Sequence, residues 1–376
     1  MIPRPQRRAA FPLLRRPIAL LAVLVLMTNG LLHHGGVAQG TPLACQPAPS
    51  ASPVAEIGPI PDIPPVSPPD DATRVTMGYI PVSIFAPVFV AYEKGYFAEQ
   101  GLDVTLEQLP GGSDMVLQTA TGGLDLGIAG TGPAFWNAAS QDLGVKIIAP
   151  GHAEGSPVAT PLMISGRACQ DGLIASVADL AGKRVSVNAP GATEFWLDAA
   201  LQTAGLSLAD VDLQFLSFPD AVVALESGAL DAAMIGEPLA TRAEQEGIAV
   251  RLLADFPVQN IQPTMIFGNE SWLASNPDAA ARFVAGYLRA SRDLTTSFND
   301  PLHLAIIQKY TDVPPQLIAE SVKPVYSTDG SISFESLSLL QGFFRERDQL
   351  DYDDDLDPAT LVDTQYVDAA LILLGQ

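Results

Sequence analysis

Positively charged side chains are scarce in this sequence. It has 20 Lys and Arg residues against 42 Asp and Glu residues, which gives a formal net charge of -22 at pH 7. Nucleic-acid phosphates are bound by clustered Lys and Arg side chains, so this imbalance argues against a nucleic-acid partner. Only 16% of the residues are charged and 48% are hydrophobic, and this composition favours a folded chain over a disordered one.

Cysteine and histidine are also rare. The chain of 376 residues has two Cys and four His, too few for an all-cysteine zinc site or a framework of several disulfides. His152 and His303 are far apart in the sequence, and there is no GxSxG nucleophile elbow and no phosphate-binding loop. We therefore expect no catalytic residue, no metal and no cofactor, and we do not expect an enzyme.

The N-terminal segment, residues 1–44, has the order of residues that is typical of an export signal. Several arginines precede an uninterrupted apolar run at residues 18–27. The run is shorter than the roughly 20 apolar residues that a transmembrane helix needs. We therefore expect residues 1–44 to direct the protein out of the cytoplasm.

A cysteine and a proline-rich stretch follow this signal. Residues 45–73 begin with Cys45 and contain many prolines, which keep a chain extended and semi-rigid. A cysteine at the end of an export signal, before such a spacer, resembles a bacterial lipoprotein. This resemblance implies a lipid on Cys45 and a place on the extracytoplasmic face of the cell membrane. Pro42 departs from the lipoprotein pattern, and cleavage near Ala38 or Ala44 with release of the protein is the alternative.

The rest of the chain contains an internal repeat. Residues 121–130 read TGGLDLGIAG, and residues 227–236 read SGALDAAMIG. Each copy predicts a helix that ends at a glycine, followed by a short apolar strand. Asp125 and Asp231 occupy the same place in the two copies. We expect both to hold the entrance of the strand rather than to contact a ligand.

Matching elements precede both copies of the repeat. The expected strand, helix and second strand are residues 74–80, 86–100 and 102–109 in the first unit and residues 184–190, 194–204 and 211–218 in the second. This alternation predicts two βαβαβ units with parallel sheets that are covered by helices on both faces. The fold class is therefore α/β, with two lobes and a ligand cleft between them.

The position of a binding site follows from this architecture. Ligands of open α/β sheets bind beyond the carboxyl ends of the strands, where helix N-termini present free N–H groups. The residues that we expect to contact a ligand are Tyr79, Ile80, Phe85, Asp114, Gly130, Thr131, Trp136, Asn188, Gly191, Thr193, Trp196 and Glu237.

Several of these residues have a structural alternative. Apolar surroundings favour a place in the core for Phe85, Phe135 and Phe195. Trp136 and Trp196 lie near helix starts, and core and ligand roles are about equally favoured for them. Tyr79, at a strand end, is the aromatic residue that we expect first at the ligand. The alternative for Glu237 is a salt bridge or a hinge contact.

Motifs spread over residues 74–300 identify a likeness to a known family. They include GYIPVSIFAPVFVAYEKGYFAEQGLDVTLEQLPGG, VADLAGKRVSV and ALESGALDAAMIGEP. The chain resembles the substrate-binding proteins of bacterial ABC importers, in the branch with the sulfonate, taurine and nitrate binders and the thiamin-pyrimidine-precursor family. The resemblance implies a two-lobed, type II periplasmic-binding-protein-like fold that delivers a small molecule to a permease and its ATPase. Enzymes that make the thiamin pyrimidine share the fold but use a cysteine-rich motif and histidines that this chain lacks.

The chain is expected to divide into four parts. We expect an export signal at 1–44, a lipid-anchor cysteine and linker at 45–73, lobe 1 at 74–162 plus 263–376 with the C-terminal helices, and lobe 2 at 163–262. We expect a monomer.

The side chains of the expected site indicate the type of ligand. An anion is usually held by helix N-termini together with Arg or Lys, and the expected binding segments contain neither cation. They contain aromatic rings, which stack on planar molecules, and carboxylates, which accept hydrogen bonds from ring N–H groups. We expect a neutral or weakly cationic planar heterocycle, with riboflavin and the thiamin pyrimidine as leading candidates. A sulfonate, taurine or nitrate is the alternative ligand, and an enzyme acting on a pyrimidine-like substrate is an alternative of another class.

Overall fold

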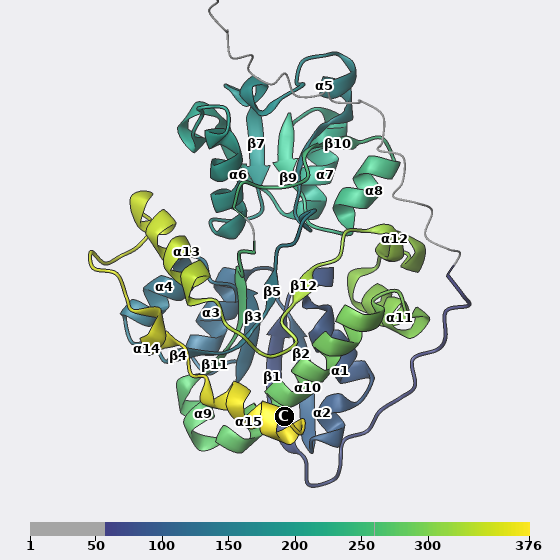
Figure 1. Cartoon of the computed structure of the whole chain (residues 1–376), viewed down its shortest axis with the longest axis vertical. Coiled ribbons are helices and arrows are strands. Elements are labelled where there is room, and N and C mark those ends of the chain that lie inside the picture. The colour runs from purple at the N-terminus through teal and green to yellow at the C-terminus, as the bar shows by residue number, and fades with distance from the viewer. Residues whose placement is uncertain (1–56, 259) are drawn as a thin grey trace, which may run out of the picture. The chain divides into compact units, whose positions relative to one another are not determined.

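The computed structural model describes residues 57–258 and 260–376 (Figure 1). The expected export signal and Cys45 lie outside the described residues. Cys169, the other cysteine, is buried. None of the helices in the described part of the chain has the length and apolarity needed to cross a bilayer.

Two five-stranded sheets organise the chain. The first sheet has the order β2-β1-β3-β11-β4 and the second the order β10-β6-β9-β7-β8. The first is formed by β1 (Thr73–Tyr79), β2 (Leu102–Gln108), β3 (Leu126–Gly130), β4 (Val145–Pro150) and β11 (Thr264–Asn269). The second is formed by β6 (Leu162–Ser165), β7 (Arg184–Val187), β8 (Asp212–Phe215), β9 (Ala232–Met234) and β10 (Ala249–Leu253).

Each sheet contains antiparallel strands beside the predicted parallel ones. In each sheet the three strands of the βαβαβ unit pair in parallel, as expected. However, β11 runs antiparallel to both of its neighbours, and β6 runs antiparallel to β9 and β10. The chain reaches β6 and β11 by crossing from the other sheet, so these strands need no βαβ crossover and can run in the opposite direction.

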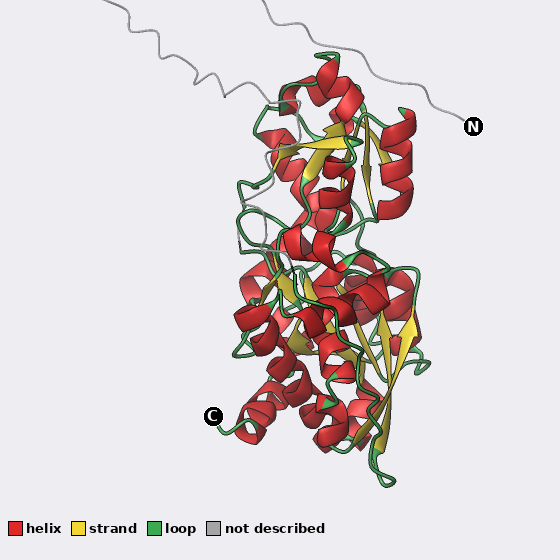
Figure 2. Ribbon diagram, turned by 90° about the vertical axis from the view of Figure 1, so that its right-hand side faces the viewer, coloured by secondary structure: helices red, strands yellow, loops and turns green. Residues whose placement is uncertain are grey.

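Helices lie on both sides of the strands (Figure 2). Those of the first unit are α1 (Ala86–Glu93), α2 (Tyr96–Glu99), α3 (Gly112–Ala120) and α4 (Pro133–Ser140). Those of the second are α5 (Gly166–Gln170), α6 (Ala192–Gln202), α7 (Phe218–Ser227) and α8 (Leu239–Gln245). The C-terminal elements are α9 (Glu270–Ser275), α10 (Pro277–Ser297), α11 (Pro301–Thr311), α12 (Pro315–Glu320), β12 (Val325–Tyr326), α13 (Phe334–Glu346), α14 (Pro358–Leu361) and α15 (Gln365–Leu373).

Glycine positions explain where several helices end. Gly122 and Gly228 follow α3 and α7 with φ values of 77° and 73°, which confirms the predicted left-handed helix ends. The predicted single helix at 86–100 is wrong, because Gly95 has a φ of 77° and separates α1 from α2. Phe218 begins α7 rather than ending the preceding strand.

The two matched aspartates hold the strand entrances, as predicted. Asp125 Oδ2 accepts hydrogen bonds from the backbone N–H (2.7 Å) and the hydroxyl (2.8 Å) of Thr76 in β1. Asp231 Oδ2 accepts from the backbone N–H of Arg184 in β7 (2.9 Å), and the Arg184 guanidinium forms an ion pair with the same carboxylate. The Arg184 side-chain hydrogen bond is the largest influence that lowers the pKa of Asp231.

The chain crosses between the sheets twice, and the crossing segments are hydrogen-bonded to each other. Gly151 N–H donates to Thr264 O (2.8 Å), and Glu154 N–H donates to Ile261 O (3.0 Å). β5 (His152–Ala153), in the first crossing, pairs with β12. The crossings lie beside the boundaries proposed above for the two lobes, near residues 162 and 262.

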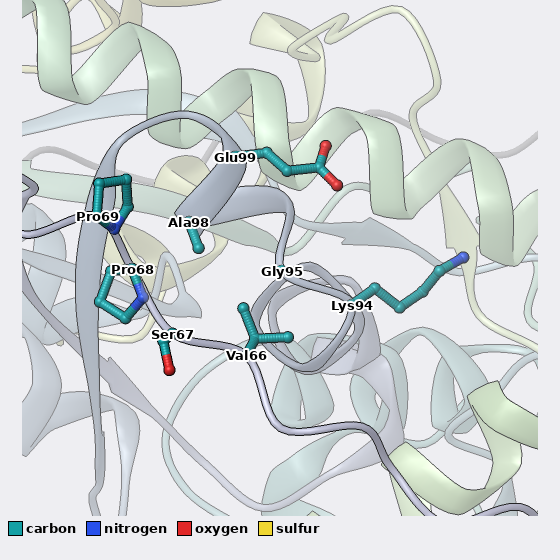
Figure 3. A pocket seen from close by; sticks show the side chains of 8 residues that line it. All are labelled: Val66, Ser67, Pro68, Pro69, Lys94, Gly95, Ala98 and Glu99. Carbon is teal, nitrogen blue, oxygen red and sulfur yellow. The ribbon is translucent and has the colours of Figure 1, made fainter.

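The described part of the proline-rich stretch packs on the first unit. Ile57 and Ile63 contact its hydrophobic core, and the Val66 side chain covers Gly95. A surface pocket lies between residues 66–69 and the α2 region (Figure 3). The segment from residue 57 onward is extended, but it is held against the body rather than standing away from it.

Candidate functional site

The N-termini of α4 and α6 meet at the boundary between the two units. Gly132 is the N-cap of α4 and Gly191 the N-cap of α6. A Cβ atom on Gly132 would lie 3.2 Å from Pro190 O and 3.7 Å from Gly191 Cα, so these loops approach closely. The loops that follow β3 and β7 therefore face each other, which is the arrangement that the duplicated fold predicts for a shared site.

The last residue of β1 lies in an aromatic cluster with side chains of α1 and α11. The Tyr79 side chain is 9% exposed, and its ring packs edge-to-face against Phe89 (5.2 Å between centroids) and Tyr310 (5.6 Å). Burial raises the pKa of Tyr79. Ile80 is half-buried, and Phe85 lies in the hydrophobic core, in agreement with its structural alternative. Tyr79 is thus firmly positioned at the carboxyl end of β1.

The loops after β2 and β3 present a mixture of exposed and core residues. Asp114 and Gly130 are exposed. Trp136 is completely buried, and its indole N–H donates to Thr131 O (3.0 Å), while Thr131 itself is buried. Trp136 therefore packs in the core and stabilises the loop, which favours its structural alternative over ligand contact.

The loop after β7 has a similar division. Asn188 is exposed, and its Oδ1 accepts a hydrogen bond from Thr193 Oγ1 (2.7 Å) at the start of α6. Trp196 is buried and stacks on Phe256, with ring centroids 6.2 Å apart and planes at 21°. Burial favours the core alternative for Trp196 as well. Asn188 and Gly191 remain the candidates of this loop for contact with a ligand.

Glu237 is a buried carboxylate with four protein donors. It accepts hydrogen bonds from Thr241 N–H (3.0 Å), Thr241 Oγ1 (3.0 Å), Arg251 Nη2 (2.7 Å) and Val322 N–H (3.3 Å). Its backbone carbonyl accepts from Ser83 Oγ (2.9 Å) in the first unit. These contacts agree with the salt-bridge alternative, and a ligand contact by Glu237 stays a prediction.

Glu194, in the first turn of α6, is the second buried carboxylate near the site. Its side chain is 0% exposed and forms an ion pair with Arg347, which follows α13. Gln349 Nε2 also donates to Glu194 Oε2 (3.0 Å). Each buried carboxylate of the site is therefore neutralised by an arginine.

Sequence reasoning missed both arginines. Arg251 lies 14 residues and Arg347 lies 153 residues from its carboxylate. No motif connects either pair, and α13 lies outside the repeat, so no signal in the sequence alone pointed to them. The expected binding segments lack cations, but the folded chain brings cations to them.

The described residues also limit the other chemistry of the site. Within residues 57–258 and 260–376, no group of three or more His, Cys, Asp or Glu side chains is arranged to hold a metal ion. The pocket in Figure 3 and an apolar pocket between α3 and α4 contain none of the expected ligand residues.

Comparisons with known proteins identify the family. A family model described as "NMT1/THI5 like" matches residues 83–297. The riboflavin-binding protein RibY of Chloroflexus aurantiacus is 28% identical over 276 residues, which cover 71% of this chain and 72% of RibY. The nitrate/nitrite binding protein NrtA of Nostoc sp. is 22% identical, with 78% of this chain and 70% of NrtA covered. A putative aliphatic sulfonates-binding protein of Escherichia coli is 26% identical, with 62% and 72% covered.

Solved structures show the same fold at low sequence identity. The alkanesulfonate-binding protein SsuA of Xanthomonas axonopodis has a TM-score of 0.65 at 17% identity, over 80% of this chain and all of SsuA. The periplasmic nitrate-binding protein NrtA of Synechocystis has a TM-score of 0.66 at 16% identity, over 82% and 90%. The desulfurization enzyme DSZB has a TM-score of 0.58 at 15% identity, over 80% and 99%. The chain therefore belongs to the NMT1/THI5-like family and has the two-lobed α/β fold of the periplasmic binding proteins.

Proposed function

We propose that the protein is the extracytoplasmic substrate-binding component of an ABC importer. The observation that carries this proposal is the close approach of the loops at Gly132 and Gly191, which follow the carboxyl ends of strands in the two sheets. Its relatives named as binding proteins for riboflavin, nitrate and sulfonates support a transport role.

The ligand that we favour is a small planar heteroaromatic molecule of the riboflavin or thiamin-pyrimidine class. Arg251 and Arg347 neutralise Glu237 and Glu194, so these buried groups offer neither a spare cation for an anion nor a spare carboxylate for a cation. Tyr79 supplies an aromatic ring that Phe89 and Tyr310 hold in place. Stacking of a planar ring on one aromatic side chain contributes on the order of 1–3 kcal/mol. The name of the relative RibY points to the same class of ligand.

A sulfonate, taurine or nitrate is the second candidate ligand. The observation in its favour is the convergence of two helix N-termini at Gly132 and Gly191, because their partial positive charges favour an anion. The relatives NrtA and the sulfonates-binding protein support this candidate.

An enzyme acting on a pyrimidine-like substrate is a candidate of another class. Its support is that the desulfurization enzyme DSZB shares the fold. Turnover of a candidate ligand by the purified protein, followed by mass spectrometry, would establish this function in place of transport.

The binding cycle follows from the two-lobed architecture. The ligand contacts residues of both lobes only when the lobes are closed, so it shifts the population towards the closed form. The closed form is then the state that a permease and its ATPase partner recognise. Tyr79 and Gly130 in lobe 1 and Asn188 and Gly191 in lobe 2 are the residues that we propose for these contacts.

A thermal-shift and calorimetry screen tests the ligand class. The exported protein is measured against riboflavin, thiamin-pyrimidine precursors, taurine, alkanesulfonates and nitrate. Stabilisation by riboflavin or a pyrimidine supports the proposal, and stabilisation by sulfonates or nitrate alone selects the second candidate. No binding of any of these compounds would contradict the proposed function.

We also propose that the protein is exported, anchored to the membrane by a lipid on Cys45, and monomeric. Metabolic labelling with a palmitate analogue should mark the wild type and not the Cys45→Ser variant; label on the variant would place the anchor elsewhere. Thiol titration and mass analysis must accompany the labelling, because a lipid thioether and a disulfide to Cys169 would both use the Cys45 sulfur. Light scattering tests the monomer.

A further inference from the structure

In the part of the chain that the structure describes, α13 and the loop that follows it contact lobe 2 through their side chains. Arg347 donates to the buried carboxylate of Glu194 in α6, and Gln349 Nε2 donates to the same carboxylate (3.0 Å). Within α13 itself, the Phe343 ring packs edge-to-face against Phe195 of α6, with centroids 5.4 Å apart. No backbone hydrogen bond is described between this loop and α6, so these contacts can break without disturbing secondary structure.

The same loop is bound to lobe 1 through its main chain. Asn137 of α4 donates from Nδ2 to Gln349 O (3.1 Å), and its Oδ1 accepts from Asp351 N–H (2.9 Å). The start of α13 is bound instead to Gln262, at the boundary between the two lobes, since Gln262 Nε2 donates to Ser331 O (3.0 Å) and Ser333 N–H donates to Gln262 Oε1 (2.8 Å). α13 contacts both α4 and α6 (Figure 1), and the main chain of the loop after α13 is bound to α4 of lobe 1.

We propose that Arg347 is a positioning residue that acts as a latch on the closed form. Its ion pair with Glu194 joins lobe 1 to lobe 2 beside the contact between Gly132 and Gly191, and the pair breaks when the lobes separate. The latch deepens the proposed function and rests on it, because it determines how readily the lobes open around a ligand.

The burial of Glu194 determines which form of the protein the ion pair stabilises. The Glu194 side chain is 0% exposed, whereas the Arg347 side chain is 29% exposed. Without Arg347, the closed form would contain a buried carboxylate that has lost its charged partner, and opening would return that carboxylate to water. Loss of one partner of a buried pair is costly, so we expect the closed-to-open ratio to fall about tenfold or more in Arg347→Gln.

Distance measurements between the lobes test the latch without any ligand. Spin labels are attached through ketone-bearing unnatural amino acids at Leu117 in α3 and Val223 in α7, both exposed and matched in the repeat, so that the cysteines are untouched. Double electron–electron resonance should show a short-distance population in the wild type and a gain of longer distances in Arg347→Gln. The double variant Glu194→Gln/Arg347→Gln should open less than Arg347→Gln, because it buries no unpaired carboxylate.

The matched control is Arg345→Gln. Arg345 lies two residues before Arg347 and pairs with Asp355, which belongs to the same C-terminal segment and not to lobe 2. This control should keep the wild-type distances. If Arg347→Gln does not fold, Gln349→Ala, which keeps the ion pair, should shift the same equilibrium a few-fold in the same direction.

Two results would overturn the latch. One is a wild-type distribution that contains only long distances. The other is a folded Arg347→Gln variant with a lowered melting temperature and unchanged distances, which would make the pair merely structural. The ligand screen is independent of this measurement, so failure of the latch is distinguishable from failure of the proposed function.

Discussion

Replacement of Glu237 by Gln separates the structural role of this residue from a role in binding. The Glu237 side chain is 0% exposed and accepts a 2.7 Å hydrogen bond from Arg251, which keeps a second partner, Glu244, at 2.9 Å. Breaking a buried pair outright costs about 3–5 kcal/mol. Because the glutamine oxygen still accepts one hydrogen bond and Arg251 keeps Glu244, we expect Glu237→Gln to lower the free energy of unfolding by about 2–3 kcal/mol.

Urea unfolding followed by circular dichroism measures this loss, and Glu244→Gln is the matched control. The control removes one carboxylate from the same arginine but leaves the contacts with Thr241 and Val322 in place. It should cost about 1 kcal/mol. Equal losses in the two variants would refute the reasoning. If Glu237→Gln also abolished ligand binding in a protein that is still fully folded at the assay temperature, Glu237 would be a ligand residue as well.

Three further predictions concern single side chains. Tyr79→Ala should weaken binding of the planar ligand by about 1–3 kcal/mol in calorimetry. Phe89 packs against the Tyr79 ring, and Phe89→Leu should weaken binding less. Unchanged affinity in Tyr79→Ala would remove Tyr79 from the site. The pKa of Asp231 is lowered in the folded state, so its contribution to stability is present above about pH 4 and lost as the pH falls further. Urea titrations at pH 7 and pH 3 should show a smaller loss of stability in Asp231→Asn than in the wild type. The same loss in both proteins would contradict the lowered pKa of Asp231. Burial lowers the pKa of Lys323 to about 8. Above that pH the unfolded chain binds more protons than the folded one, so the stability of the wild type relative to Lys323→Met should rise by about 2–3 kcal/mol between pH 8 and pH 10. A stability difference that does not change with pH would refute the shift.

Much of the fold could be predicted because its signals are local or repeated. The copies TGGLDLGIAG and SGALDAAMIG located two equivalent strands, and the glycines after α3 and α7 marked the helix ends. The role of Asp125 and Asp231 followed from their matching positions, and the structure confirms it. These features depend on residues within about ten positions of one another, or on their recurrence in the second copy.

The arrangement of the antiparallel strands could not be predicted in this way. β11 joins the first sheet only after the chain has passed through the whole second sheet, and its direction depends on that return rather than on its own residues. The aromatic residues show the same limit at the level of side chains. Trp136 and Trp196 lie near helix starts, as candidates for a site should, yet the helices turn both rings into the core.

The sequence by itself determined the two α/β units, their glycine-rich loops and the likeness to importer-binding proteins, because composition and local pattern encode secondary structure directly. Only the tertiary structure decided the charge of the site. Arg347 reaches Glu194 across 153 residues, and Arg251 reaches Glu237 beside Val322. The stability of a buried charge depends on which groups surround it in space, and sequence distance carries no information about those neighbours.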